Sequence, residues 1–185
     1  MSDPYKRRSW RSHKFDNRTI AAIRALEDRL GRRVTIYQGS YSTSVGASGS
    51  THAGGGAVDL WVPGMDADSV TRAARRIGWA CWWRTPSQGD WSDHQHAILR
   101  GHVTASPDAK LQVGDFDNRG DGLWPLTGHD DPQPYRPVRE VTFNYRAWVK
   151  QRTLLARIRH LGRDIAALKD RRRRTRRRLR KIRTT

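Results

Sequence analysis

The positive charge of this 185-residue chain is concentrated at its C-terminal end. The whole chain has 36 Lys and Arg against 18 Asp and Glu, a formal charge of +18. Residues 150–185 hold sixteen of the basic residues and two of the acidic ones, so this segment alone carries +14. The rest of the chain carries only +4, and it is long enough for one ordinary domain. We therefore expect one folded domain followed by a strongly basic segment.

Several classes of protein are excluded by composition. No run approaches the roughly 20 apolar residues that a transmembrane helix needs. The basic N-terminus is not followed by an apolar stretch, so no secretory signal peptide is expected. Cys81 is the single cysteine, which excludes an intrachain disulfide and a cysteine-based zinc finger. A metal site in this chain would need histidine and carboxylate ligands.

The order of periodic and Gly-rich segments predicts a mixed α and β domain. Apolar residues at helical spacing indicate two helices, each with an Asp or Asn that can cap its start and a Gly that ends it. Short β-branched or aromatic runs indicate strands. The expected elements are a helix after Asp16 or Asn17 that ends at Gly31, a helix from Asp66 or Asp68 to Gly78, strands at 33–37, 57–62, 79–84 and 94–99, a loop at 38–56, and mostly irregular chain at 102–137.

An amphipathic pattern runs through the basic segment. Leucine and isoleucine alternate at spacings of four and three, which is typical of one helix face or a short coiled coil. The arginine run 171–178 follows, and its self-repulsion opposes a helix unless an anion screens it. Residues 154–168 are a candidate surface for docking or self-association. Residues 169–183 are a candidate site for an anionic polymer (nucleic acid, wall polymer or membrane surface), or a solvated charge run. The apolar positions are Leu154, Ile158, Leu161, Ile165 and Leu168.

Two distant segments bring together residues that bind metals. His52 stands in a glycine-rich stretch, and Asp59 follows on the strand expected at 57–62. His94 and His96 project from one face of a later strand, because alternate residues of a strand share a face. Two histidines and an aspartate are ligand types that zinc accepts, and a catalytic zinc site keeps one position open for water. A bound zinc ion lowers the pKa of that water to about 7 and polarises a carbonyl group.

The spacing in the first segment resembles a known motif. The pattern Ser-x-His-x-x-Gly-x-Ala-x-Asp is similar to the first motif of the zinc D-Ala-D-Ala carboxypeptidase and L-Ala-D-Glu endopeptidase family, the LAS group of peptidoglycan peptidases. It is met at Ser50, His52, Gly55, Ala57 and Asp59.

The second segment resembles the second motif of the same family. Asp93 and His96 have the Asp-x-x-His spacing of phage endolysins of this kind, and His94 with His96 gives the His-x-His form of lysostaphin-like members. Gln95 stands where members of the family often have Trp. Without the resemblance, Asp93 and His96 could also form a plain hydrogen-bonded pair.

The resemblance implies a fold and a set of roles. The fold is α+β, a small antiparallel sheet with flanking helices of the LAS or hedgehog-like type, to which this chain adds a long basic C-terminal helix. The zinc (Zn²⁺) ligands are His52, Asp59 and His96, the general base is Asp93 or His94, and the substrate is the stem peptide of peptidoglycan. The turn at 38–42 lacks the arginine that members of the family often carry, so Gln38 or Tyr41 is expected to polarise the scissile carbonyl. Substrate contacts are expected from Gln38, Tyr41, Ser50, Trp82 and Trp91.

These inferences predict an arrangement of domains and a setting. The domains are a basic lead-in at 1–15, a zinc peptidase-like domain at 16–125, a Pro-rich linker at 126–146 and a basic helix at 147–185. A phage endolysin or a tail-associated wall-degrading protein is expected, in the virion or in the host cytoplasm before release. The alternative is a structural virion or tail protein of weak or lost activity, docked through the helix. The histidines outside both motifs are expected at the surface, at positions His13, His102, His129 and His160.

Overall fold

The computed structural model describes residues 2–43, 46, 50–126 and 141–183, with side chains as far as residue 176. The chain forms two compact units, residues 1–145 and residues 146–185. Among the described residues, no helix combines the length and the apolar character that crossing a membrane requires.

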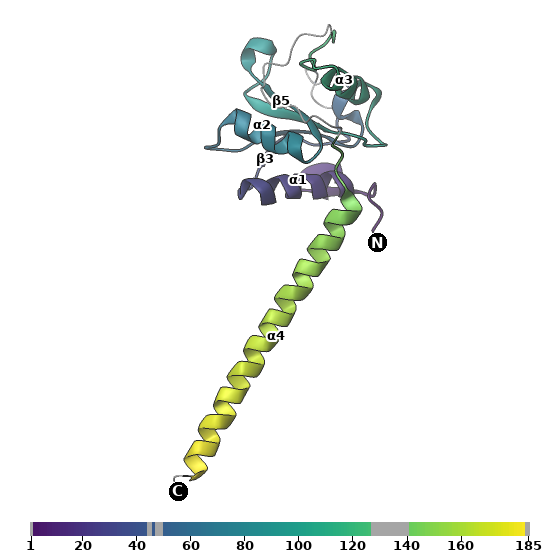
Figure 1. Ribbon diagram of the computed structural model, residues 1–185. Coiled ribbons are helices and arrows are strands. Elements are labelled where there is room, and N and C mark those ends of the chain that lie inside the picture. The colour runs from purple at the N-terminus through teal and green to yellow at the C-terminus, as the bar shows by residue number, and fades with distance from the viewer. Residues whose placement is uncertain (1, 44–45, 47–49, 127–140, 184–185) are drawn as a thin grey trace. The chain divides into compact units, whose positions relative to one another are not determined.

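The first unit is built on an antiparallel sheet of four strands. The strands are β3 (Thr35–Gln38), β4 (Ala57–Trp61), β5 (Trp79–Arg84) and β6 (His94–Leu99), in the order β3-β4-β6-β5. Figure 1 labels the two edge strands, β3 and β5. The central strands β4 and β6 are buried along almost their whole length. The expected small antiparallel sheet in an α+β domain is confirmed.

Two helices pack against each other, and one of them packs against the sheet at β5 and β6. Helix α1 (Asn17–Leu30) begins at Asp16, whose carboxylate accepts a hydrogen bond from the Thr19 amide, and ends at Gly31 in the left-handed region. Helix α2 (Ala67–Arg76) begins in the same way at Asp66 and packs against β5 and α1. Arg75 Nε donates to the Cys81 carbonyl, so α2 is tied to the sheet. Both helices and their N-caps at Asp16 and Asp66 agree with the expectation, and α1 ends at Gly31 as expected, whereas the C-cap of α2 is Ile77, one residue before Gly78.

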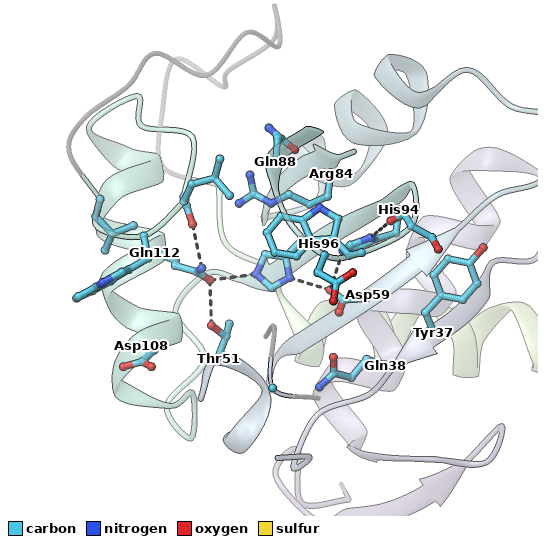
Figure 2. A pocket seen from close by; sticks show the side chains of 18 of the residues that line it. Tyr37, Gln38, Thr51, Asp59, Arg84, Gln88, His94, His96, Asp108 and Gln112 are labelled. Carbon is cyan, nitrogen blue, oxygen red and sulfur yellow. Dashed lines mark hydrogen bonds and ion pairs between the residues drawn. The ribbon is translucent and has the colours of Figure 1, made fainter. Parts of the chain in front are cut away.

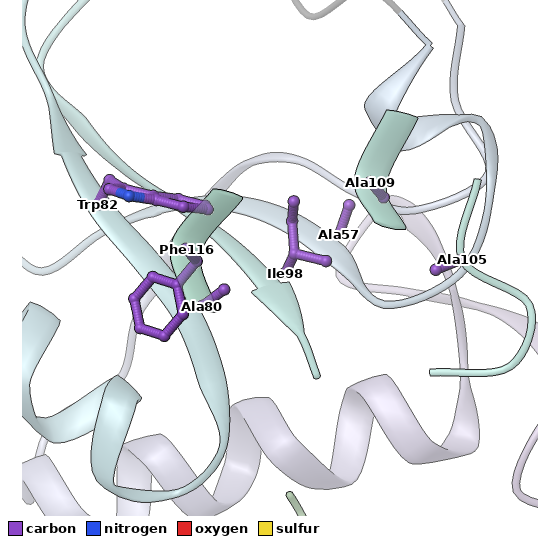
Figure 3. Close-up of a cluster of buried hydrophobic side chains, with 7 residues drawn as sticks. All are labelled: Ala57, Ala80, Trp82, Ile98, Ala105, Ala109 and Phe116. Carbon is purple, nitrogen blue, oxygen red and sulfur yellow. The ribbon is translucent and has the colours of Figure 1, made fainter. Parts of the chain in front are cut away.

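The opposite sheet face packs against a helix that the sequence analysis missed. Helix α3 (Pro107–Asp117) begins at Ser106, whose hydroxyl accepts from the Ala109 amide, with Pro107 at the first helical position. The expectation of mostly irregular chain at 102–137 is therefore wrong for 107–117, and 127–137 lies outside the described residues. Figure 3 shows the cluster that α3 completes: Ala57, Ala80, Trp82, Ile98, Ala105, Ala109 and Phe116.

The first fifteen residues are more ordered than a lead-in. Strands β1 (Arg7–Trp10) and β2 (His13–Asp16) pair as an antiparallel hairpin around Arg11 and Ser12, which both have positive φ. Phe15 is fully buried, and this anchors the hairpin to the domain. The boundary predicted at residue 15 falls inside β2. Two short 3₁₀ helices, η2 (Thr51–Ala53) and η3 (Pro86–Gln88), complete the unit.

The second unit is the helix α4 (Tyr145–Arg183). It starts close to the predicted position and continues through the arginine run, so the long basic helix is confirmed. The Pro-rich linker was predicted at 126–146, and of this segment 127–140 lie outside the described residues.

Candidate metal centre

Three buried side chains converge on one point between the central strands and a loop. Asp59 and His96 are cross-strand neighbours in the β4–β6 register, and His52 comes from η2. The Asp59 Oδ1 atom lies 2.7 Å from His96 Nδ1, a contact that Figure 2 shows. The same atom lies 3.3 Å from His52 Nε2. The three candidate ligand atoms lie within 4.8 Å of one another, which is close enough to bind one metal ion.

The loop that carries His52 is held by backbone contacts. The Tyr41 amide donates to the Gly54 carbonyl over 2.9 Å, and the Gly55 amide donates to the Thr104 carbonyl over 2.9 Å. A Cβ atom at Gly54 would lie 2.3 Å from the backbone nitrogen of Ser106. The glycines at 54–56 therefore allow three chain segments to approach closely, and this approach places His52 beside the sheet.

Hydrogen bonds assign the protonated nitrogen of each ligand histidine. His52 Nδ1 faces the Gly39 carbonyl at 2.9 Å and therefore carries a proton, so Nε2 of the neutral ring has a free lone pair. Gln112 donates through Nε2 to the Gly122 carbonyl, which directs its Oε1 toward His96. His96 Nε2 lies 3.0 Å from that oxygen and must donate to it, so Nδ1 of the neutral ring has a free lone pair.

The resulting arrangement needs a cation. The lone pairs of His52 Nε2 and His96 Nδ1 both face the Asp59 carboxylate, and three electron-rich atoms at this distance repel unless a proton or a metal ion lies among them. His52 Nε2 is buried and has no hydrogen-bond partner among the described residues. The outer contacts to Gly39 and Gln112 are the kind that orient metal-binding histidines. The donor set therefore fits a divalent metal.

Burial and charge shift the pKa values of all three residues. Burial favours the neutral form of Asp59, but in the absence of a metal ion the positive charges of His52 and His96 in their protonated forms, together with their hydrogen bonds, outweigh burial and hold the pKa of Asp59 well below its usual range. Burial also opposes protonation of His52, yet the neighbouring Asp59 raises the pKa of His52 above its ordinary value. Burial lowers the pKa of His96. Asp59 is therefore a carboxylate at neutral pH, as a metal ligand must be.

A pocket of about 830 Å³ opens onto the cluster. Asp59, His94 and His96 reach it from the sheet, and Gln112 and Leu111 reach it from α3. Apolar side chains form much of its remaining wall, which is typical of a site that binds an organic ligand. These side chains include Tyr37, Trp91, Leu123, Trp124 and Leu126.

The two candidates for the general base, His94 and Asp93, differ in burial and in whether they line the pocket. His94 is buried, lines the pocket and has Nε2 at 3.8 Å from Asp59 Oδ1. Its Nδ1 lies 2.6 Å from the Ser92 carbonyl, so Nδ1 carries the proton and Nε2 can accept one. The Asp93 side chain is exposed and is not among the residues that line the pocket. Geometry therefore favours His94.

The five expected substrate contacts divide into two groups. Gln38 and Trp91 line the pocket. Ser50, Tyr41 and Trp82 do not: Ser50 is exposed and donates to Asp108, and the Tyr41 hydroxyl donates to Asp16. Trp82 is 1% exposed, stacks on His96 and donates to the Gly120 carbonyl. Its side chain is part of the buried cluster against α3, so the structure does not place it at the pocket wall.

A second buried cluster lies outside both motifs. His102 was expected at the surface, but its Nε2 lies 3.1 Å from Asp16 and both side chains are fully buried. The Asp16 carboxylate also accepts from Thr19 and Tyr41. The His102 ring fills the space beside Gly56, where a Cβ would approach it to 2.8 Å. The cluster therefore packs against the glycines that follow His52 in the chain.

Two residues of the pocket carried no signal in the motifs. Gln112 was missed together with α3, and only the packing of that helix brings it to His96. Arg84 is buried at the end of β5, opposite His94 in the strand register, and supplies a positive charge to the pocket. Its position at the end of a predicted strand was the one available indication.

Searches against protein-family models, curated proteins and solved structures gave no match.

Proposed function

We propose that this protein is a zinc-dependent peptidase of the LAS type that cleaves the stem peptides of peptidoglycan. The observation that carries the proposal is the convergence of His52, Asp59 and His96, at the spacing of the two motifs, beside a pocket lined by a candidate base. The resemblance of the motifs supports the choice of zinc, the LAS-type fold, the substrate class and a phage setting as an endolysin or tail protein.

Three residues would hold the metal and others would serve the reaction. When bound by His52, Asp59 and His96, zinc would supply a Lewis acid and lower the pKa of a water molecule. His94 Nε2 would accept a proton from the attacking water and return it to the leaving amine. Arg84 or Gln38 would stabilise the negative charge that develops on the carbonyl oxygen, the role that an oxyanion hole has in acyl transfer.

The proposal predicts different results for ligand and base variants. Purified full-length protein and the variants His96→Ala, His94→Ala and Asp93→Ala would be compared for zinc content and for release of muropeptides from cell walls. We expect His96→Ala to lose both zinc and cleavage. His94→Ala keeps zinc and loses cleavage by roughly 10²- to 10⁴-fold, the typical contribution of a general base. Asp93→Ala keeps both.

A matched control and two contrary outcomes complete the design. His160→Ala removes an exposed histidine of α4 and should change neither quantity. Cleavage that survives in His96→Ala would overturn the peptidase proposal. Zinc binding by the wild type without cleavage of any wall preparation would instead favour a structural virion protein that keeps the metal site.

A further inference from the structure

Helix α4 presents a continuous apolar row to solvent. The five side chains of the row are between 52% and 63% exposed, although each is a leucine or isoleucine. They follow one side of a helix of 39 residues. An exposed apolar row of this length marks a contact surface. Its members are Leu154, Ile158, Leu161, Ile165 and Leu168, and we call them the α4 seam.

The composition of the α4 seam indicates the kind of partner. Spacings of four and three residues place Ile158 and Ile165 at one seam position, a, of a heptad repeat, and the three leucines at the other, d. Isoleucine at a with leucine at d favours two parallel strands, whereas other combinations shift the preference to three or four strands. A second copy of this helix presents the same row, so the seam is complementary to itself.

Charges beside the α4 seam support the same pairing. In a parallel pair, a residue at position g faces the e residue five positions later on the partner. Asp164 is at g and Lys169 is at e, so two opposite-charge pairs form by symmetry. Among the described side chains of its own helix, Asp164 contacts His160 at 3.5 Å, and both side chains are exposed. Such an exposed pair is weak and leaves the carboxylate available to the partner's lysine.

We propose that α4 forms a parallel two-stranded coiled coil with the α4 helix of a second copy of this chain, through the α4 seam. Parallel pairing also brings two arginine-rich segments together just beyond Leu168. Arg171, Arg172 and Arg173 are exposed, and their like charges repel those of the other copy. Salt screens this repulsion. The dimer therefore strengthens as the salt concentration rises, which is the opposite of the response of a complex held by arginine and an anionic polymer.

Sedimentation equilibrium of the full chain tests the proposal with two matched variants. Ile165→Asp places a carboxylate at an a position within the seam, and Ala167→Asp adds the same charge to the outer face. We expect Ile165→Asp to raise the dimer dissociation constant by roughly a hundredfold or more, because a buried charge is left unpaired. Ala167→Asp should change it by less than about threefold. Circular dichroism checks that both variants keep the helix.

A charge exchange tests the direction of pairing. Asp164→Lys should weaken the dimer by roughly threefold or more, and adding Lys169→Asp should restore it, because g and e residues face each other only in the parallel arrangement. A chain that stays monomeric at low and high salt overturns the proposal. A trimer, or a double variant no stronger than Asp164→Lys alone, also overturns it. None of these outcomes depends on the peptidase proposal.

Discussion

Neutralising Asp16 should destabilise the first unit far more than the loss of a helix cap would. Asp16 caps α1, but its buried carboxylate also accepts hydrogen bonds from Tyr41 at 3.0 Å and pairs with His102 at 3.1 Å. Asparagine caps a helix about as well as aspartate, so Asp16→Asn keeps the cap and removes the charge. Breaking a buried pair costs about 3–5 kcal/mol, against about 1 kcal/mol for a cap.

Urea unfolding at pH 7 measures this difference. A loss of about 3 kcal/mol lowers the unfolding midpoint by roughly 1 M or more, because the slope in urea is about 1–3 kcal/mol/M for small domains. Asp66→Asn is the matched control, since Asp66 caps α2 with the same contact to an amide but is exposed. Its midpoint should stay at the wild-type value. Equal midpoints for the two variants would refute the reasoning and reduce Asp16 to a helix cap.

Three further predictions concern pH, the metal and the loop. Burial raises the pKa of Asp16, but the hydrogen bond from His102 and its charge outweigh burial and hold this pKa below its ordinary value of 3.8. The excess in free energy of unfolding of the wild type over Asp16→Asn should therefore shrink as pH falls below about 4. An excess that grows there in urea unfolding would contradict this. Gln112→Leu should weaken zinc binding by roughly 10- to 100-fold, because His96 loses the partner that fixes its tautomer. A competition assay with a chelator measures this, and an unchanged affinity would show that Gln112 does not orient His96. Gly54→Ala should lower the midpoint of thermal unfolding, because the added Cβ would clash with the backbone of a neighbouring segment. Gly114→Ala, in open space on α3, should raise the midpoint slightly. Equal shifts for the two variants would contradict the close approach at the loop.

Local features of the sequence were sufficient to predict most strands of the sheet. The bounds of β5 and β6 agree with the predicted strands, because each run is flanked by turn residues. Gly78 and the turn before His94 flank β5, and the same turn and Gly101 flank β6. The capped start and glycine end of α1 are equally local features. The three residues of the metal cluster were named from the resemblance of the two motifs, whereas strand alternation predicted only that His94 and His96 share a face.

The parts that were missed depend on contacts between distant segments. Helix α3 has a weak apolar periodicity, with Gly114 and three aspartates among its eleven residues, and its burial comes from packing on Trp82 and Ile98. His102 has no motif around it, and its partner Asp16 lies 86 residues away. Asp93 and His94 are adjacent in sequence, so the spacing alone could not tell which of them faces the pocket.

Asp59 and His96 lie on β4 and β6, the two inner strands of the sheet, and these strands should be the last part of the first unit to open. Amides of central strands exchange with solvent only when a domain unfolds as a whole, while loops open with far smaller free energies. The link between Asp59 and His96 should therefore persist until the sheet itself comes apart. His52 lies on a loop, so opening of that loop could remove one ligand and weaken metal binding while Asp59 and His96 stay paired in the intact sheet.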